Sequence, residues 1–121
     1  MNNFHELPKD RWIHESVSFF VIKDGFPVSA GHCLIISKEL KESFFDLSDD
    51  EKQELVKLID TVKALIENEY SPAGYNIGMN CGVAAGQSVM HFHCHVIPRY
   101  AGDMENPKGG VRYCIPEKGL Y

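Results

Sequence analysis

The chain of 121 residues has no long apolar run and no surplus of positive charge. Its longest apolar run, from Val17 to Ile22, contains Ser18 and is far shorter than the roughly 20 residues of a membrane-spanning helix. A formal net charge of −5 disfavours non-specific binding to nucleic acid, which needs a basic surface. We therefore expect neither a membrane nor a nucleic acid as partner, although a local site can still hold a small anion.

The sequence also has few cysteines, and none of them form a C-x-x-C pair. The segment Met1–Glu6 has neither the basic start nor the apolar stretch of a secretory signal, so we expect no export and a cytoplasmic location. In that compartment thiols stay reduced, and a chain with enough core needs no disulfides. We expect reduced, mostly buried thiols at Cys33, Cys81, Cys94 and Cys114.

The length of the chain allows one hydrophobic core but not two, so we expect a single domain over residues 1–121. The sequence contains no internal repeat and no linker. Short segments rich in β-branched and aromatic residues, each bounded by turn-forming residues, are typical of strands. They predict five strands, at residues 11–14, 18–23, 31–37, 75–80 and 87–98.

One segment has the pattern of a long helix. Ser48 and Glu51 have the spacing of a capping box, which marks a helix start. Apolar residues at intervals of three and four from Leu55 to Ile66 form one face of a helix of about five to six turns, and Ser71–Gly74 ends it. The strands and this helix predict an α+β domain with an antiparallel sheet. We expect the tail, residues 99–121, to be extended and irregular.

Three of the six histidines, His91, His93 and His95, alternate with Phe92 and Cys94. Alternation of period two is typical of a strand, so it predicts that the three imidazoles project from one face. Neutral imidazole is well suited to nucleophilic attack and proton transfer near pH 7. The row of histidines therefore predicts a reaction centre or a metal site.

Two other interpretations of the histidines remain open. A histidine on a strand is most often a structural residue, although three in register are unlikely to be so by chance. A zinc site is the stronger alternative, because His-x-His on a strand can place two ligands on one metal. Further ligands could then come from carboxylates or from the other histidines, His5, His14 and His32.

The segment Gly86-Gln87-Ser88 leads directly into the histidine row. Glycine allows close approach of the backbone, and serine and glutamine offer hydroxyl and amide groups. A turn of this kind can present N–H groups to phosphate oxygens. On its own, a polar loop beside a strand is the simpler interpretation of these three residues.

Taken together, these segments resemble the histidine triad (HIT) family of nucleotide hydrolases and transferases. Gly31–Lys38 is similar to the family's Gly-His-x-Leu-φ-φ-Pro-Lys strand, where φ is apolar, with Ser37 in place of the usual proline. Asn80–His95 is similar to the family's Asn-x6-Gln-Ser-φ-x-His-φ-His-φ-His segment. Three tail segments resemble the dinucleoside-polyphosphate hydrolases more than the phosphoramidases: Pro98–Asp103, Gly109–Arg112 and Ile115–Lys118.

The resemblance implies a HIT-like fold, in which a short helical segment packs on the sheet beside the long helix. It implies cleavage at the α-phosphate of a purine nucleotide conjugate, a dinucleoside polyphosphate or a nucleoside phosphoramidate, through a nucleotidyl-histidine intermediate. It also implies a homodimer whose sheets join edge to edge. The cysteine pair that binds metal in some members is absent, so we expect no metal or other cofactor bound by the protein. Magnesium could still accompany a polyphosphate substrate.

The resemblance assigns roles to individual residues. His93 is expected to be the nucleophile, His95 to bond the phosphoryl oxygens, and His91 to join His32 in an orienting network. The expected substrate contacts are Asp24, eight residues before His32, for the ribose; Gln87 and Ser88 for the phosphates or leaving group; Leu7 and Ile22 for the base; and Asn80 and Gly86 within the matched segment.

Two alternatives to a hydrolase that acts through a nucleotidyl-histidine remain open. A regulatory module could bind a nucleotide in the same pocket with little turnover, and a zinc-dependent hydrolase would act through a metal. The sequence does not identify the leaving group. Base preference is hidden as well, because apolar walls hold any purine with similar energy.

Overall fold

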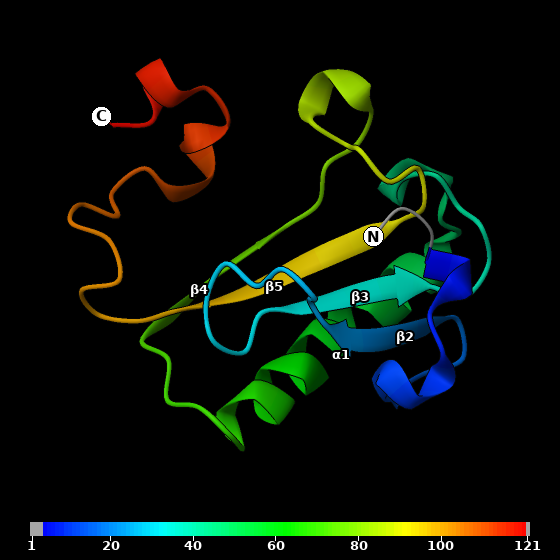
Figure 1. Cartoon of the computed structure of the whole chain (residues 1–121). Helices are drawn as coiled ribbons and strands as arrows, with labels where there is room; N and C mark the ends of the chain where they lie inside the picture. Colours follow the sequence, from blue (N-terminus) through cyan, green and yellow to red (C-terminus); the bar gives the residue numbers. More distant parts are fainter. Residues whose placement is uncertain (1–3, 121) are drawn as a thin grey trace.

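The computed structural model describes residues 4–120 of the chain. Five antiparallel strands form one sheet in the order β1-β2-β3-β5-β4, which confirms the predicted α+β fold (Figure 1). The strands are β1 (Trp12–Glu15), β2 (Phe19–Lys23), β3 (Cys33–Ser37), β4 (Gly74–Gly78) and β5 (His93–Arg99). Within residues 4–120 the single α-helix is α1 (Asp49–Glu67), and short 3-10 helices make up the remaining helical segments.

Helix α1 covers one face of the sheet and forms the main core with it. The capping box is present: the Ser48 backbone N–H donates to Glu51 Oε1 at 2.7 Å, and the Glu51 N–H donates to Ser48 Oγ at 3.1 Å. The predicted apolar face is buried through Leu55, Leu58, Val62 and Ile66. Because burial of apolar surface stabilises a helix more than its intrinsic propensity does, this face fixes α1 against the sheet.

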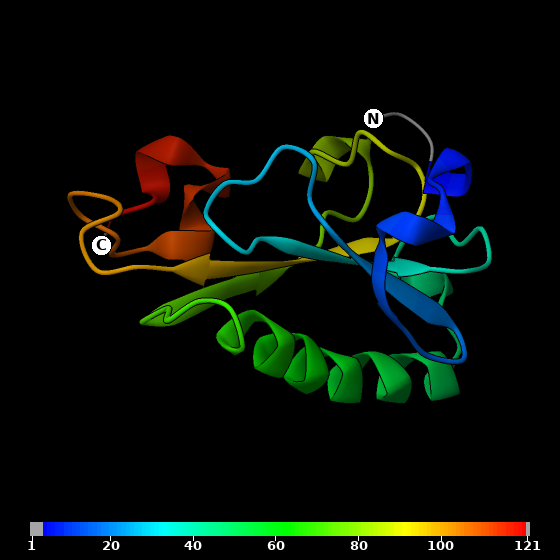
Figure 2. The same cartoon turned by 60° about the horizontal axis from the view of Figure 1, so that its bottom comes forward.

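The opposite face of the sheet carries a smaller apolar cluster and no α-helix. Figure 2 shows α1 below the sheet, with the N-terminal 3-10 helices and the β2–β3 loop above it. The N-terminal helices are η1 (Phe4–Glu6) and η2 (Lys9–Arg11). The cluster beneath them consists of Phe4, Phe20, Ile22, Leu34 and Ile36, with Leu7, Trp12 and Val89 packed against it. This thinner cover leaves room for a site beside the cluster.

The last strand begins later than predicted. β5 starts at His93, whereas alternation of residue types predicted a strand from residue 87. The regular ladder ends there: the Phe92 N–H donates to the Lys41 carbonyl at 2.6 Å, although the Phe92 carbonyl still accepts from the Ser37 N–H of β3 at 3.4 Å. His91 therefore lies in the bend before β5, so the expectation of three histidines on one strand is wrong for His91.

The tail predicted to be extended contains two 3-10 helices, η5 (Gly110–Cys114) and η6 (Pro116–Lys118). All four cysteines are free; Cys33 and Cys94 are buried, Cys81 is half-buried and Cys114 is exposed. Among residues 4–120 no helix is both long and apolar enough to cross a bilayer.

Candidate active site

Strand β5 places His93 and His95 side by side on the face of the sheet that α1 leaves open. His93 pairs with Ile36 of β3, and His95 pairs with Leu34. The alternating residues Cys94 and Val96 point the other way and are buried in the core under α1. Both imidazoles are half-buried, and their ring centroids are 5.3 Å apart.

The hydrogen bond of His93 fixes where its ring carries the proton. His93 Nδ1 lies 2.8 Å from the carbonyl oxygen of His91. A carbonyl oxygen only accepts, so Nδ1 must be the donor, and in the neutral ring the lone pair is then on Nε2. His93 therefore offers a nucleophilic nitrogen on the ring edge away from its own backbone support.

The neighbouring His95 has the opposite arrangement. The backbone N–H of Val28 donates to His32 Nδ1 at 3.0 Å, so in the neutral ring of His32 the proton is on Nε2. His32 Nε2 lies 3.0 Å from His95 Nδ1 and donates to it, which leaves the proton of His95 on its own Nε2. The site thus presents a lone pair from His93 beside an N–H from His95.

Burial favours the uncharged forms of the His95 and His32 rings. Desolvation, together with the nearby His93 and His32 and against the opposing effect of Asp24, lowers the pKa of His95 to about 4. Desolvation also lowers the pKa of His32, again against the effect of Asp24. Neutral rings are what the hydrogen-bond pattern requires, since protonated imidazole has no lone pair to accept with.

Asp24 lies at the start of the loop that leads to His32. Its Oδ1 accepts the Phe26 N–H at 2.9 Å, as in a turn, and its Oδ2 lies 3.3 Å from His32 Nε2. The Asp24 side chain is 11% exposed. The carboxylate therefore both shapes the turn and faces the His32 ring, with a small exposed part left for a ligand.

Asp24, His32 and His95 are also the candidate metal site within the described residues, because their ligand-type atoms lie within 4.8 Å of one another. The hydrogen-bond pattern does not fit a metal, however. A neutral histidine that binds metal through Nε2 must carry its proton on Nδ1. His32 Nδ1 instead accepts the Val28 N–H, so His32 would have to lose that bond or become an imidazolate.

His91 supports the site from behind. Its ring is buried, and its Nε2 donates to the Ser37 carbonyl at 2.7 Å. Its own carbonyl accepts from His93, as described above. The expected network of His91 with His32 is wrong in its partner, because His32 contacts His95 and Asp24. Phe4 packs edge-on against His91 and His93, with centroid distances of 5.5 and 5.0 Å.

The Gly86-Gln87-Ser88 segment lies in the loop before His91, after the 3-10 helix η4 (Val83–Ala85). The Gln87 side chain is buried: Nε2 donates to the carbonyls of Glu42 (2.6 Å) and Val89 (3.1 Å), and Oε1 accepts the Gly82 N–H (2.8 Å). Both amide hydrogens are used, so the expected contact of Gln87 with phosphate has no donor left. Ser88, Asn80 and Gly86 are exposed, and Gly86 has a left-handed φ of 94°.

The two residues expected to line a base pocket lie in the apolar cluster on the histidine face. Leu7 is half-buried and lines a hollow of about 280 Å³ that also contains Phe4, Trp12 and His91. Ile22 is 0% exposed, so it supports this cluster from within and does not face the hollow. The N–H of Val28 and the ring of Phe4 were not predicted: a backbone group has no sequence signature, and a lone N-terminal phenylalanine has a weak one.

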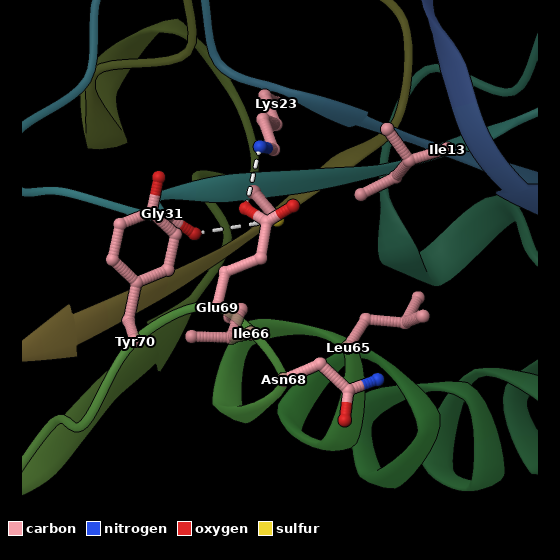
Figure 3. A pocket seen from close by; sticks show the side chains of 9 residues that line it. Ile13, Lys23, Gly31, Leu65, Ile66, Asn68, Glu69 and Tyr70 are labelled. Carbon is pink, nitrogen blue, oxygen red and sulfur yellow. Dashed lines mark hydrogen bonds and ion pairs between the residues drawn. The ribbon is translucent and has the colours of Figure 1, made fainter.

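A second hollow, of about 250 Å³, lies between β1–β3 and the last turn of α1 (Figure 3). An ion pair of 2.7 Å between Lys23 and Glu69 spans it, and Tyr70 packs beside Gly31. Its thiol, Cys33, is unreactive because burial raises the pKa of that group to about 11. None of the site histidines lines this hollow, so it is separate from the candidate active site.

Comparison with known proteins agrees with this arrangement. The family model of the HIT domain matches residues 6–102, which include all the histidines of the site. A HIT-like protein of Mycoplasma pneumoniae is 38% identical over 89 residues, 73% of this chain and 61% of that protein. The asymmetrical bis(5'-nucleosyl)-tetraphosphatase of Schizosaccharomyces pombe is 38% identical over 77 residues, 64% of this chain and 42% of the enzyme. The chain spans less than two thirds of either relative.

A solved structure gives the same result at the level of the fold. A zinc-bound histidine triad family protein from Mycobacterium smegmatis superimposes with a TM-score of 0.70 at 30% identity, over 78% of this chain and 69% of that one. The chain belongs to the HIT domain family.

Proposed function

We propose that this protein cleaves a nucleotide conjugate at its α-phosphate, with His93 Nε2 as nucleophile and a nucleotidyl-histidine as intermediate. One observation carries the proposal. The lone pair on His93 and the N–H on His95 lie side by side, each fixed by a hydrogen bond to a neighbouring group. A nucleophile next to a donor for the developing charge is what phosphoryl transfer requires.

In the first step His93 Nε2 forms a bond to the α-phosphorus, and the bond from phosphorus to the leaving group breaks. The leaving group departs with the electron pair, and the positive charge that forms on the His93 ring is shared with the His91 carbonyl through Nδ1–H. The His95 N–H donates to a phosphoryl oxygen as charge builds up there. In the second step water attacks phosphorus, the P–N bond breaks with its electron pair returning to Nε2, and the proton that water loses passes to the solvent.

For the substrate we propose a dinucleoside polyphosphate, with a nucleoside phosphoramidate as the alternative. The activity named for the Schizosaccharomyces pombe relative supports the first choice. In this proposal the base lies against the apolar cluster near Leu7, the ribose approaches Asp24, and the phosphates approach the exposed Ser88. We further propose a cytoplasmic homodimer, for which β4, at one end of the sheet, offers an edge for strand pairing.

The proposal is tested by measuring kcat/KM for a panel of adenosine and guanosine dinucleoside polyphosphates and phosphoramidates. We expect a nucleoside monophosphate as one product of every substrate that turns over. Tight nucleotide binding without turnover of any member of the panel would instead support a regulatory module.

Turnover is expected to survive exhaustive removal of transition metals, since His93 attacks phosphorus without a metal and the Val28 N–H opposes metal binding at His32. The measurement compares untreated and chelated protein in buffer with added magnesium, which can still coordinate a polyphosphate substrate. Activity that is lost to the chelator, and that returns with zinc but not with magnesium, would contradict this prediction.

Asp24→Ala is expected to weaken the binding of a ribonucleotide by about ten-fold or more, because a charge-assisted hydrogen bond contributes roughly 1.5–3 kcal/mol to the binding free energy. A 2′,3′-dideoxynucleotide has no hydroxyls to lose, so it should bind the variant as well as it binds the parent. Calorimetric titration of both ligands against both proteins separates the ribose contact from the effect on the turn. Equal losses for the two ligands would leave Asp24 with its turn and His32 contacts only.

A further inference from the structure

The loop between β2 and β3, drawn in cyan in Figure 1, is held by hydrogen bonds along its length. The His32 N–H donates to the Ser29 carbonyl at 3.2 Å, and Ser29 Oγ donates to the Pro98 carbonyl at 2.5 Å. The Tyr100 hydroxyl donates to the Ala30 carbonyl at 2.6 Å. Two of these bonds join the loop to Pro98 of β5 and to Tyr100, which follows β5. The loop is therefore held to the strand that carries the histidines.

Gly31 also helps to hold the loop in one conformation. Gly31 has a φ of +93°, and a Cβ atom added there would lie 2.9 Å from Cδ2 of Tyr70. The backbone therefore turns at Gly31 in a conformation that other residues rarely adopt, directly against the Tyr70 ring. The next residue is His32, so the direction of its ring is set by a tight and well-supported turn.

We propose that the backbone N–H of Val28, on this loop, is the group that fixes the proton positions of His32 and His95, and so selects the donor that His95 presents to substrate. The inference rests on the proposed function for its consequence in catalysis, but not for its geometry. The N–H points at His32 Nδ1 at 3.0 Å, and a proton on Nδ1 would place two hydrogens against each other.

Burial makes this selection effective. The His32 side chain is 1% exposed, so no solvent is available to accept from Nδ1 or to stabilise the other tautomer. The His32 Nε2–H has two acceptors within reach, His95 Nδ1 at 3.0 Å and Asp24 Oδ2 at 3.3 Å. Because His95 Nδ1 is then an acceptor, the only hydrogen of the neutral His95 ring is on Nε2.

The same N–H keeps a metal away from the cluster of Asp24, His32 and His95. Coordination through His32 Nε2 would move the ring proton to Nδ1, where Val28 already donates. Val28 therefore has two effects that can be measured separately: it sets the tautomers in the free protein, and it raises the cost of binding zinc. Neither effect depends on knowing the substrate.

The first test uses nuclear magnetic resonance on the full-length parent protein labelled with ¹⁵N. We expect a through-hydrogen-bond coupling between the Val28 amide nitrogen and His32 Nδ1, and a second one between His32 Nε2 and His95 Nδ1. The ring shifts should report protons on Nε2 of His32 and His95 and on Nδ1 of His93. A proton found on Nδ1 of His32 overturns the proposal.

The second test compares Val28→Pro, which removes the N–H, with the matched control Val28→Ala, which keeps it. We expect Val28→Pro to show mixed tautomers at His32, a lower Kd for zinc in calorimetry, and a kcat about 10- to 100-fold below that of Val28→Ala with a similar KM. Identical tautomers and zinc affinity in the two variants would contradict the proposal. If Val28→Pro does not fold, the couplings in the parent protein decide.

Different results would refute the proposed function and the proposed role of the Val28 N–H. Couplings and tautomers as expected, with no turnover of any substrate in the parent protein, would refute the proposed function and leave the positioning by Val28 in place. Turnover through His93 together with a proton on Nδ1 of His32 would refute the positioning and leave the proposed function in place.

Discussion

His93→Ala is expected to lower kcat on the order of 10,000-fold, while the affinity for a nucleotide product stays close to that of the parent. The reason is that the substitution removes the ring whose Nε2 lone pair is fixed by the bond from Nδ1 to the His91 carbonyl. The proposed binding contacts, from the apolar cluster and from Asp24, lie on other residues. The measurement combines single-turnover kinetics with calorimetric titration of nucleoside monophosphate.

The matched control for this variant is His14→Ala, which removes a histidine from the edge strand β1, outside the site. Its kcat should be close to that of the parent. Turnover by His93→Ala within ten-fold of the His14→Ala control would mean that another group attacks phosphorus.

His95→Ala is expected to lower kcat by about 100- to 1,000-fold with little change in KM. This is the range observed when one donor to a developing oxyanion is removed. The His95 N–H is directed by His32, so its donation costs no reorganisation when charge forms on the phosphoryl oxygens. The loss should therefore appear in the chemical step, which rapid-quench measurements resolve from product release.

His95→Gln separates this role from a merely structural one. Glutamine can present an amide N–H near the same place, so it should restore part of the lost kcat, by about ten-fold over His95→Ala. If His95→Ala raised KM and left kcat unchanged, His95 would contribute to ground-state binding and not to the transition state.

Much of the fold follows from local patterns. The capping box of Ser48 and Glu51 and the three-and-four spacing from Leu55 to Ile66 specify α1, because a helix start and an amphipathic face are both local signals. The buried strand β3 was equally clear. The start of β5 is not clear from the sequence. The alternation of the histidine row continues back to His91, although the Phe92 N–H already bonds to the Lys41 carbonyl and not to a strand partner.

The sequence predicts which residues belong to the candidate site better than it predicts which of them contact one another. His93 and His95 share a face, as period two requires, but the pairing of His32 with His95 depends on the strand order β3-β5, which the sequence does not encode locally. Gln87 is a related case: one of the groups that its amide bonds, the Glu42 carbonyl, lies 45 residues away in the sequence. The Val28 N–H carries no side-chain signal at all, and only the folded loop places it.

The most direct test of the central claim is to trap the intermediate in a single turnover. Parent protein is mixed with a limiting amount of a dinucleoside polyphosphate, quenched in base at millisecond intervals, digested, and analysed by mass spectrometry. We predict a transient nucleotidyl group on His93, stable in base and lost in acid, that forms and decays at rates able to account for kcat. Product formation with no adduct at any time, or with an adduct on a residue other than His93, would contradict the account.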